Sequence, residues 1–187
     1  MTTTTLCHAD DSVLVLVDVQ QRLAASMPDE SLAGLVAAAT RLLQAADRLG
    51  IPVIVTEQYP AGLGTTLEEL RDRLPAGHRL LDKTSFSCCG ADGFEAHLQS
   101  LNRRQLVLTG METHICVLQT ALQLRAGGYT VFVAEDAVCA RSAARSRNGI
   151  ERMRQAGVIV SHSESVLFEW LGDARHEHFK AVSALLK

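Results

Sequence analysis

The 187-residue sequence predicts a three-layer α/β/α sandwich around a central six-stranded parallel sheet. Short apolar runs, such as residues 12–19, are typical of strands buried on both faces of a parallel sheet. Longer segments with apolar residues at helical spacing separate these runs, and such alternation indicates crossover helices on both sides of the sheet. A composition of 47% hydrophobic and 21% charged residues fits one globular domain over residues 1–187.

The first half of the chain predicts three of the strands, at residues 12–19, 51–56 and 79–83. Helices are expected over residues 29–49 and near residues 67–74. Gly50 ends the first helix, because glycine readily adopts the left-handed conformation that follows a helix. Asp18 lies near the carboxyl end of the first strand and Lys83 ends the third. Residues 57–66 form a glycine-bearing loop, and loops of this length are often functional.

The second half predicts the other three strands, at residues 105–109, 129–134 and 158–160. Four helices are expected over residues 93–101, 143–155, 162–171 and 173–186. A further helix starts almost at Cys116 and ends at Gly127-Gly128. This placement puts the Cys116 thiol at a helix N-terminus, where the helix dipole and unpaired backbone N–H groups favour the thiolate.

Three chemically complementary residues follow strands of the predicted sheet. If the strand order is the common 3-2-1-4-5-6, the first and fourth strands are neighbours and the chain changes direction between them. Ligands of such sheets bind in the crevice at that point, beyond the carboxyl ends of the strands. Asp18, Lys83 and Cys116 should therefore meet on one rim of the sheet.

A carboxylate, an ammonium and a thiol on one rim suit nucleophilic catalysis. Asp18 can accept the thiol proton and return it to a leaving group, and Lys83 supplies positive charge. Backbone N–H groups of the turn over residues 112–116 can stabilise an oxyanion. The predicted reaction is acyl transfer to Cys116, followed by hydrolysis of the thioester.

Each of these residues also has a structural interpretation. Cys116 can be one more small buried side chain, Asp18 can cap a turn, and Lys83 can form an ion pair that only stabilises the fold. Two other classes of function use the same scaffold. One is a binding or regulatory module without turnover, and the other is redox sensing through a low-pKa Cys116.

Other motifs expected for this architecture are missing from the sequence. No G-x-G-x-x-G follows the first strand, and no G-x-x-x-x-G-K-[ST] occurs. Gln20 stands where aspartyl-phosphate chemistry would require a second aspartate, and there is no G-x-S-x-G elbow. These absences argue against dinucleotide binding, P-loop chemistry, aspartyl-phosphate chemistry and an α/β-hydrolase serine.

Composition excludes several further classes. A net charge of −3, scattered basic residues and 4% aromatic residues argue against nucleic-acid binding. The sequence has no apolar run of membrane-spanning length, and residues 1–11 lack the features of a targeting signal, so we expect a cytoplasmic protein. The five cysteines form no C-x-x-C pair, which argues against disulfides and a zinc ribbon. We expect no metal site, since His176 and His178 would point apart on a helix.

In combination, several motifs of the chain resemble the isochorismatase-like cysteine hydrolase superfamily, and specifically its isochorismatase domain-containing branch. The motifs are Leu16-Val17-Asp18-Val19-Gln20, the stretch 56–64 (Thr-Glu-Gln-Tyr-Pro-Ala-Gly-Leu-Gly), Lys83-Thr84-Ser85-Phe86-Ser87, the stretch 110–120 (Gly-Met-Glu-Thr-His-Ile-Cys-Val-Leu-Gln-Thr) and Ser163-Glu164-Ser165-Val166-Leu167-Phe168. They occur in the order of the family and span nearly the whole chain.

The resemblance implies a Rossmann-like fold and a triad of Asp18, Lys83 and Cys116. It also implies a cis peptide bond at Met111-Glu112, in a turn that forms an oxyanion hole together with Cys116. Metal-binding relatives carry Asp-x-His after the second strand, but this chain has residues 57–60, Glu-Gln-Tyr-Pro, which argues against metal dependence and against nicotinamide as substrate. The presence of Cys116 argues against isochorismate hydrolysis.

The expected activity is therefore metal-independent cleavage of a C–N bond in a small amide-like molecule, without a cofactor. Four residues near the strand ends are candidates for the pocket walls: Gln20, Leu23, Tyr59 and Phe86. By the same resemblance we expect a homo-oligomer, a dimer or larger.

Overall fold

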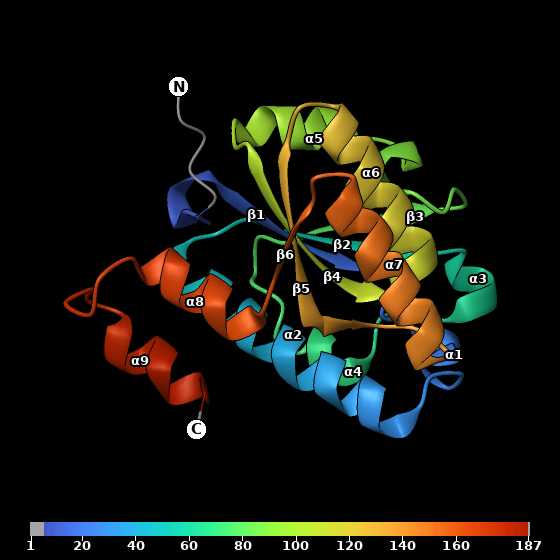
Figure 1. The fold of residues 1–187 in the computed structure, drawn as a ribbon, viewed down its shortest axis with the longest axis horizontal. Helices are drawn as coiled ribbons and strands as arrows, with labels where there is room; N and C mark the ends of the chain where they lie inside the picture. Colours follow the sequence, from blue (N-terminus) through green and yellow to red (C-terminus); the bar gives the residue numbers. More distant parts are fainter. Residues whose placement is uncertain (1–5, 187) are drawn as a thin grey trace.

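Strands and helices alternate along the computed structural model, which describes residues 6–186 (Figure 1). No targeting signal was expected in residues 1–11, and the first five of these lie outside the described residues. The strands are β1 (Ser12–Val17), β2 (Val53–Gln58), β3 (Arg79–Lys83), β4 (Gln105–Met111), β5 (Thr130–Cys139) and β6 (Ile159–Ser161). They form one parallel sheet in the order β3-β2-β1-β4-β5-β6, which confirms the predicted order.

Helices cover both faces of this sheet. They are α1 (Gln21–Ala24), α2 (Asp29–Leu49), α3 (Pro60–Leu63), α4 (Glu68–Arg71), α5 (Phe94–Leu101), α6 (Leu118–Ala126), α7 (Ala143–Gln155), α8 (Ser163–Leu171) and α9 (Phe179–Ser183). Helices α2, α8 and α9 pack on one face, and α5, α6 and α7 pack on the other (Figure 1). The predicted three-layer architecture is therefore confirmed.

The central strands are apolar because both of their faces are covered. All six residues of β1 are buried, and alternate side chains enter the two core clusters, Leu14 and Leu16 on the α2 side and Val13, Val15 and Val17 on the other. Burying one such aliphatic side chain contributes about 1.5–3 kcal/mol to folding. The apolar run thus fixes β1 as a central strand and carries the chain directly to the edge where Asp18 lies.

Several element boundaries differ from the prediction. The strand β2 continues to Gln58, β4 to Met111 and β5 to Cys139, and the predicted loop 57–66 contains α3. Polar residues in β2 and β5, and Gly110 in β4, hid the extensions because they interrupt the apolar runs. The last predicted helix, 173–186, is helical only as α9 and a final turn, Ala184–Leu186. His176 and His178 therefore precede the helix, and their ring centroids lie 5.7 Å apart.

Gly110 brings β1 and β4 unusually close at their carboxyl ends. Its φ is +116°, and a Cβ atom added there would lie 2.0 Å from the carbonyl oxygen of Val17. Only glycine accommodates both the backbone conformation and this approach. As a result, Asp18, which follows Val17, lies close to the turn that follows β4.

No helix within residues 6–186 is long and apolar enough to cross a membrane. All five cysteines lie in this range and are free thiols: Cys7, Cys88, Cys89, Cys116 and Cys139.

Candidate active site

Asp18 follows β1 and is held in place by side chains from β2 and β3. Its backbone has a positive φ of 50°, and its side chain is fully buried. The carboxylate oxygen Oδ2 accepts a hydrogen bond of 2.6 Å from Lys83 Nζ, and Oδ1 accepts one of 2.7 Å from Thr56 Oγ1. Burial raises the pKa of Asp18 above its ordinary value, while Lys83, Thr56 and Cys116 act in the opposite direction. A carboxylate with a raised pKa is a better proton acceptor.

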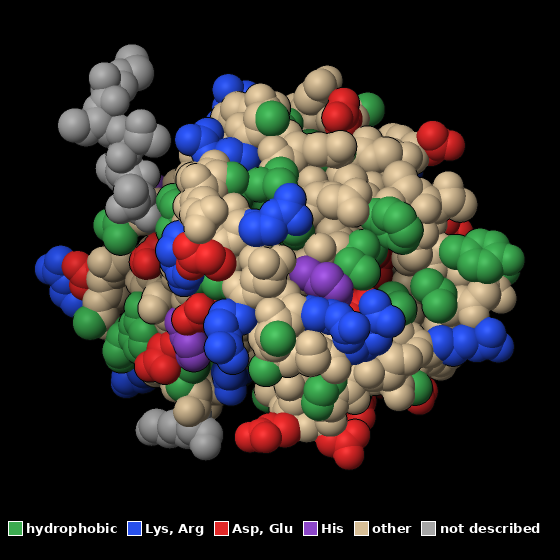
Figure 2. All heavy atoms as spheres, turned by 45° about the vertical axis from the view of Figure 1, so that its right-hand side comes forward, with side chains coloured by type: hydrophobic (Ala, Val, Ile, Leu, Met, Phe, Trp, Pro, Cys, Tyr) green, Lys and Arg blue, Asp and Glu red, His purple; other side chains and the backbone are tan. Residues whose placement is uncertain are grey.

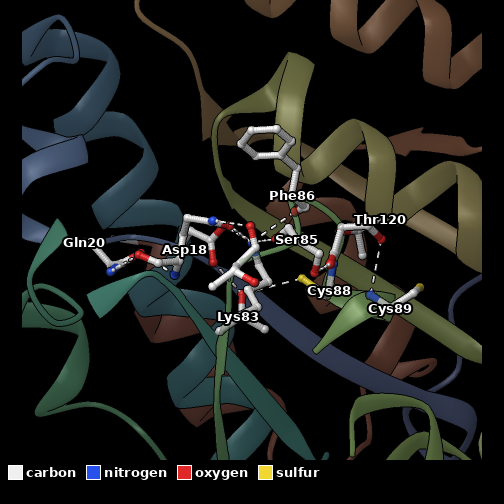
Figure 3. Close-up of polar contacts among 12 residues, drawn as sticks. Asp18, Gln20, Lys83, Ser85, Phe86, Cys88, Cys89 and Thr120 are labelled. Atoms are coloured by element: carbon white, nitrogen blue, oxygen red, sulfur yellow. Dashed lines mark hydrogen bonds and ion pairs between the residues drawn. The ribbon is translucent and has the colours of Figure 1, made fainter. Parts of the chain in front are cut away.

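Lys83 reaches Asp18 from the end of the edge strand β3, across β2. Its side chain is buried, and the ammonium also donates to Gln58 Oε1 at 2.7 Å. Two backbone carbonyls of the following loop accept from it as well, that of Phe86 at 3.0 Å and that of Ser85 at 3.2 Å (Figure 3). The positive charge is therefore fixed in place by acceptors on three sides.

Cys116 does not begin an α-helix, contrary to the prediction. It lies within a π-helical turn, Thr113–Val117, which precedes α6. Burial raises the pKa of the Cys116 thiol to about 12, the carboxylate of Asp18 raises it further, and Lys83 partly offsets these effects. The expected thiolate at a helix N-terminus is thus corrected, because burial and the nearby carboxylate of Asp18 keep the Cys116 thiol protonated.

The turn before Cys116 begins with a cis peptide bond between Met111 and Glu112, at the position that the family resemblance implied. The carboxylate of Glu112 accepts hydrogen bonds from the backbone N–H of Arg141 at 3.2 Å and from its Nε at 3.0 Å. The turn is also tied to α7, where Ser146 Oγ lies 3.2 Å from Thr113 Oγ1. These contacts fix the backbone that carries the thiol.

A small cavity of about 110 Å³ opens onto Cys116. Its walls are mainly apolar and consist of Leu23, Gln58, Leu63, Phe86, Glu112, Ile115 and Cys116. A larger hollow of about 730 Å³ lies between α2 and α4, but none of the three complementary residues lines it. The small cavity is therefore the candidate binding site, because it contains the thiol.

Two of the four predicted wall residues, Leu23 and Phe86, line this cavity. The other two do not. Gln20 is fully buried, and its amide binds the backbone of Gln58 and the carbonyl of Gly64, so it ties loops together. Tyr59 is 58% exposed and lines a neighbouring cleft beside β3. Figure 2 shows hydrophobic side chains gathering on the right of the face it draws, toward the side where α1 and α3 lie.

Two polar residues of the site were not predicted from the sequence. Thr56 and Gln58 lie two positions apart on β2, so both side chains point to the same face of the sheet. Thr56 contacts Asp18 and Gln58 contacts Lys83. The available signal was their spacing: two polar residues at a period of two, at the end of an otherwise apolar strand.

Glu57 points to the opposite face of β2 from these two residues. It is buried, and its Oε1 accepts hydrogen bonds from the N–H of Thr66 at 2.6 Å and from its Oγ1 at 2.8 Å. Glu57 therefore anchors the loop that follows α3. Within residues 6–186, no group of three His, Cys, Asp or Glu side chains is placed to hold a metal ion.

Sheet order and site together define the class of this molecule, a three-layer α/β protein with the isochorismatase-like hydrolase fold. The chain belongs to the isochorismatase family, because residues 12–165 match the isochorismatase domain. The family resemblance found in the sequence is therefore confirmed.

Named relatives agree with this assignment. The chain is 42% identical over 180 residues to isochorismatase domain-containing protein 2 of Xenopus laevis, covering 94% of this chain and 83% of that protein. It is 37% identical to isochorismatase domain-containing protein 1 of Salmo salar, of which it spans 61%. Among solved structures, the MAR1 ribonuclease of Caenorhabditis elegans superposes with a TM-score of 0.91 at 35% identity, covering 97% of this chain and 92% of that one.

Proposed function

We propose that the protein is a metal-independent cysteine hydrolase that cleaves the C–N bond of a small amide through a thioester on Cys116. The proposal rests on one observation above all. A buried carboxylate, ammonium and thiol converge beside a cavity at the switch point of the sheet, although they come from three distant parts of the chain. Glu112 also lines that cavity, but its carboxylate already accepts hydrogen bonds from Arg141.

The first half of the reaction forms the thioester. As Cys116 Sγ attacks the carbonyl carbon, the carboxylate of Asp18 takes the thiol proton, so no free thiolate accumulates. Backbone N–H groups of the turn over residues 112–116 stabilise the oxyanion. When the C–N bond breaks, Asp18 returns the proton to the nitrogen and the amine leaves.

The second half of the reaction restores the enzyme. Water gives its proton to Asp18 and attacks the thioester carbon, the C–S bond breaks, and the proton returns to Cys116 as the acid leaves. Throughout the cycle Lys83 keeps its positive charge near Asp18 and the sulfur, where it offsets the negative charge that moves between them.

The cavity supports a small and largely neutral substrate. Its walls are mainly apolar, and its volume of about 110 Å³ suits short aliphatic amides and ureas. The name of the nematode neighbour raises RNA as an alternative. A net charge of −3 gives no electrostatic attraction for a polyanion, so we favour the amide.

Intact-mass measurement during turnover of short primary amides and ureas tests this proposal. We expect an acyl adduct on the wild-type chain and none on Cys116→Ala, which should fold normally and lose all turnover. As a matched control, Cys139→Ala removes another buried thiol and should retain both adduct and turnover.

Four outcomes would overturn the proposal. Turnover by Cys116→Ala would show that Cys116 is not the nucleophile. Activity that a chelator removes and zinc restores would show that the enzyme depends on a metal ion. Cleavage of an RNA oligonucleotide without any amide turnover would favour the alternative substrate. If neither class of substrate reacts, the binding or redox-sensing module becomes the better interpretation.

We further propose a homo-oligomeric, cytoplasmic protein that needs no cofactor and whose partner is a small molecule rather than nucleic acid or a membrane. The assembly, a dimer or larger, follows from the family resemblance. Exposed Leu80 on the edge strand β3 provides apolar surface that a second copy could cover.

A further inference from the structure

The ion pair between Asp18 and Lys83 spans a strand that belongs to neither residue. In the sheet β2 lies between β1 and β3, with Thr56 opposite Val17 on one side and Leu81 on the other. Because neighbouring strands lie about 4.8 Å apart, β1 and β3 are separated by about twice that distance. A group on β2, between the two residues, can therefore hold the carboxylate in place.

Thr56 is that group on geometric grounds. It is fully buried, and its Oγ1 lies 2.7 Å from Oδ1 of Asp18, the oxygen that Lys83 does not use. An ionised carboxylate can only accept hydrogen bonds, so the single proton of the threonine hydroxyl points to Asp18. The two oxygens of the base are thus held by two different donors on two different strands.

A second thiol faces the other side of the same hydroxyl. Cys88 Sγ lies 3.5 Å from Thr56 Oγ1, and this sulfur is fully buried. Since the hydroxyl proton is already directed at Asp18, the S–H of Cys88 must be the donor in this contact. Burial keeps that thiol protonated by raising its pKa to about 11. A directed chain of donors therefore runs from Cys88 through Thr56 to Asp18.

This chain of donors is anchored close to Cys116, the proposed nucleophile. The backbone N–H of Cys88 donates to Thr120 Oγ1 at 2.9 Å, and Thr120 lies four residues after Cys116, in α6 (Figure 3). The charged or titratable side chains that act on Asp18 are Lys83 from β3, Cys116 from the π-helical turn and Cys88 from the turn Cys88–Gly90. Thr56 is the neutral donor among them, so it orients the carboxylate without changing the net charge.

We propose that Thr56 is a positioning residue for Asp18, and that the Cys88 thiol fixes the direction of its hydroxyl proton. This inference rests on the proposed function, because it assigns these residues to the general base of that reaction. It gives the second buried thiol near the site a role as a donor, distinct from the nucleophilic role of Cys116.

The titration midpoint of Asp18 reports directly on the hydrogen bond from Thr56, and its measurement needs no substrate. In protein with ¹³C-labelled aspartate, the carboxyl signal of Asp18 is assigned by its loss in Asp18→Asn and followed against pH. In Thr56→Val, a nearly isosteric change, we expect the midpoint to rise by about one pH unit, the size expected for one hydrogen bond to a charged acceptor. Thr56→Ser should restore the wild-type midpoint, since serine keeps the hydroxyl.

Two further variants separate this role from simple packing. Thr109→Val removes another buried threonine hydroxyl, which contacts the carbonyl of Val15, and should leave the midpoint unchanged. Cys88→Ala should raise the midpoint by less than half of the Thr56→Val shift, because it weakens the donor chain without removing the hydroxyl.

An unchanged midpoint in folded Thr56→Val, or an equal shift in Thr109→Val, would overturn the role of Thr56. An unchanged midpoint in Cys88→Ala would overturn that of Cys88. Failure of the amide reaction leaves this titration measurable, so the two proposals can fail separately.

Discussion

Cys116, the proposed nucleophile, is held in the folded protein as a protonated thiol. Burial and the adjacent carboxylate of Asp18 both disfavour a negative charge on the sulfur, and a single lysine only partly compensates. Activation must therefore occur during the attack, by proton transfer to Asp18, rather than before substrate binds. This property separates a hydrolase from a redox sensor, which needs a standing thiolate that reacts with oxidants.

The first prediction concerns the reactivity of this thiol. With iodoacetamide, alkylation of Cys116 should be far slower at about pH 8 than alkylation of the unfolded chain, whose thiols titrate near their ordinary value. Because the pKa is about 12, the rate should still rise about tenfold per pH unit between about pH 8 and pH 10. Peptide mass mapping after timed quenching measures this rate. A rate that levels off below about pH 8 would reveal a stable thiolate and contradict the conclusion that Cys116 is a protonated thiol.

At the scale of elements, the close approach of β1 and β4 depends on one residue. Gly110→Ala should destabilise the protein by more than about 3 kcal/mol, because the added Cβ meets the Val17 carbonyl and the positive φ becomes strained. Urea unfolding followed by circular dichroism measures the loss. Any surviving folded protein should also have lost turnover, since Asp18 and the Cys116 turn are displaced together.

Gly34 provides the matched control for this glycine. It lies on the exposed side of α2, and no atom comes within 4 Å of an added Cβ. Gly34→Ala should therefore stabilise the protein by about 0.5–1 kcal/mol, through the higher helix propensity of alanine. If both substitutions have the same effect, the steric argument for Gly110 is wrong.

Elements with clear end signals were predictable from the sequence. The helices α2 and α7 and the strand β3 have the predicted bounds, and α2 ends at Gly50 with the left-handed conformation that only a few residue types adopt easily. The extensions of β4 and β5 were not predictable, because their last residues are paired by neighbouring strands rather than by an apolar pattern.

Some features of the candidate site were likewise predictable from the sequence and others were not. Asp18, Lys83 and Cys116 could be placed on one rim, because strand ends in a parallel sheet lie on one edge once the strand order is known. The π-helical turn around Cys116 could not be predicted, since it has the same residue preferences as an ordinary helix start. The use of Gln20 as a loop tie, in place of a pocket wall, also required coordinates, because an amide side chain suits both roles.

For the whole molecule, the buried thiols make the free energy of unfolding depend on pH in the alkaline range. Burial raises the pKa of Cys7, Cys116 and Cys139 to about 12 and that of Cys88 to about 11, from an ordinary value of 9.0. In the unfolded chain these groups lose protons at lower pH than in the folded protein. Their contribution to stability is therefore complete below about pH 9 and is lost as pH rises toward their folded pKa values.

The third prediction follows from this linkage. Between about pH 9 and pH 11, the free energy of unfolding should fall by up to about 5 kcal/mol per pH unit, and Cys88 should contribute less than the other three thiols near pH 11 because its folded pKa is about 11. Urea midpoints measured under reducing conditions test the slope. The double variant Cys7→Ala, Cys139→Ala should show about half of it. A flat profile in this range would mean that the thiols ionise equally well in the folded protein.

The volume of the cavity also sets an order of events. A space of about 110 Å³ has room for only a few water molecules. Under the proposed mechanism, an acyl group on Cys116 and a departing amine would fill it together, so the attacking water can enter only after the amine has left. The products are therefore released in a fixed sequence, amine before acid. The kinetics should be ping-pong, and a nucleophile as small as hydroxylamine should intercept the thioester in place of water.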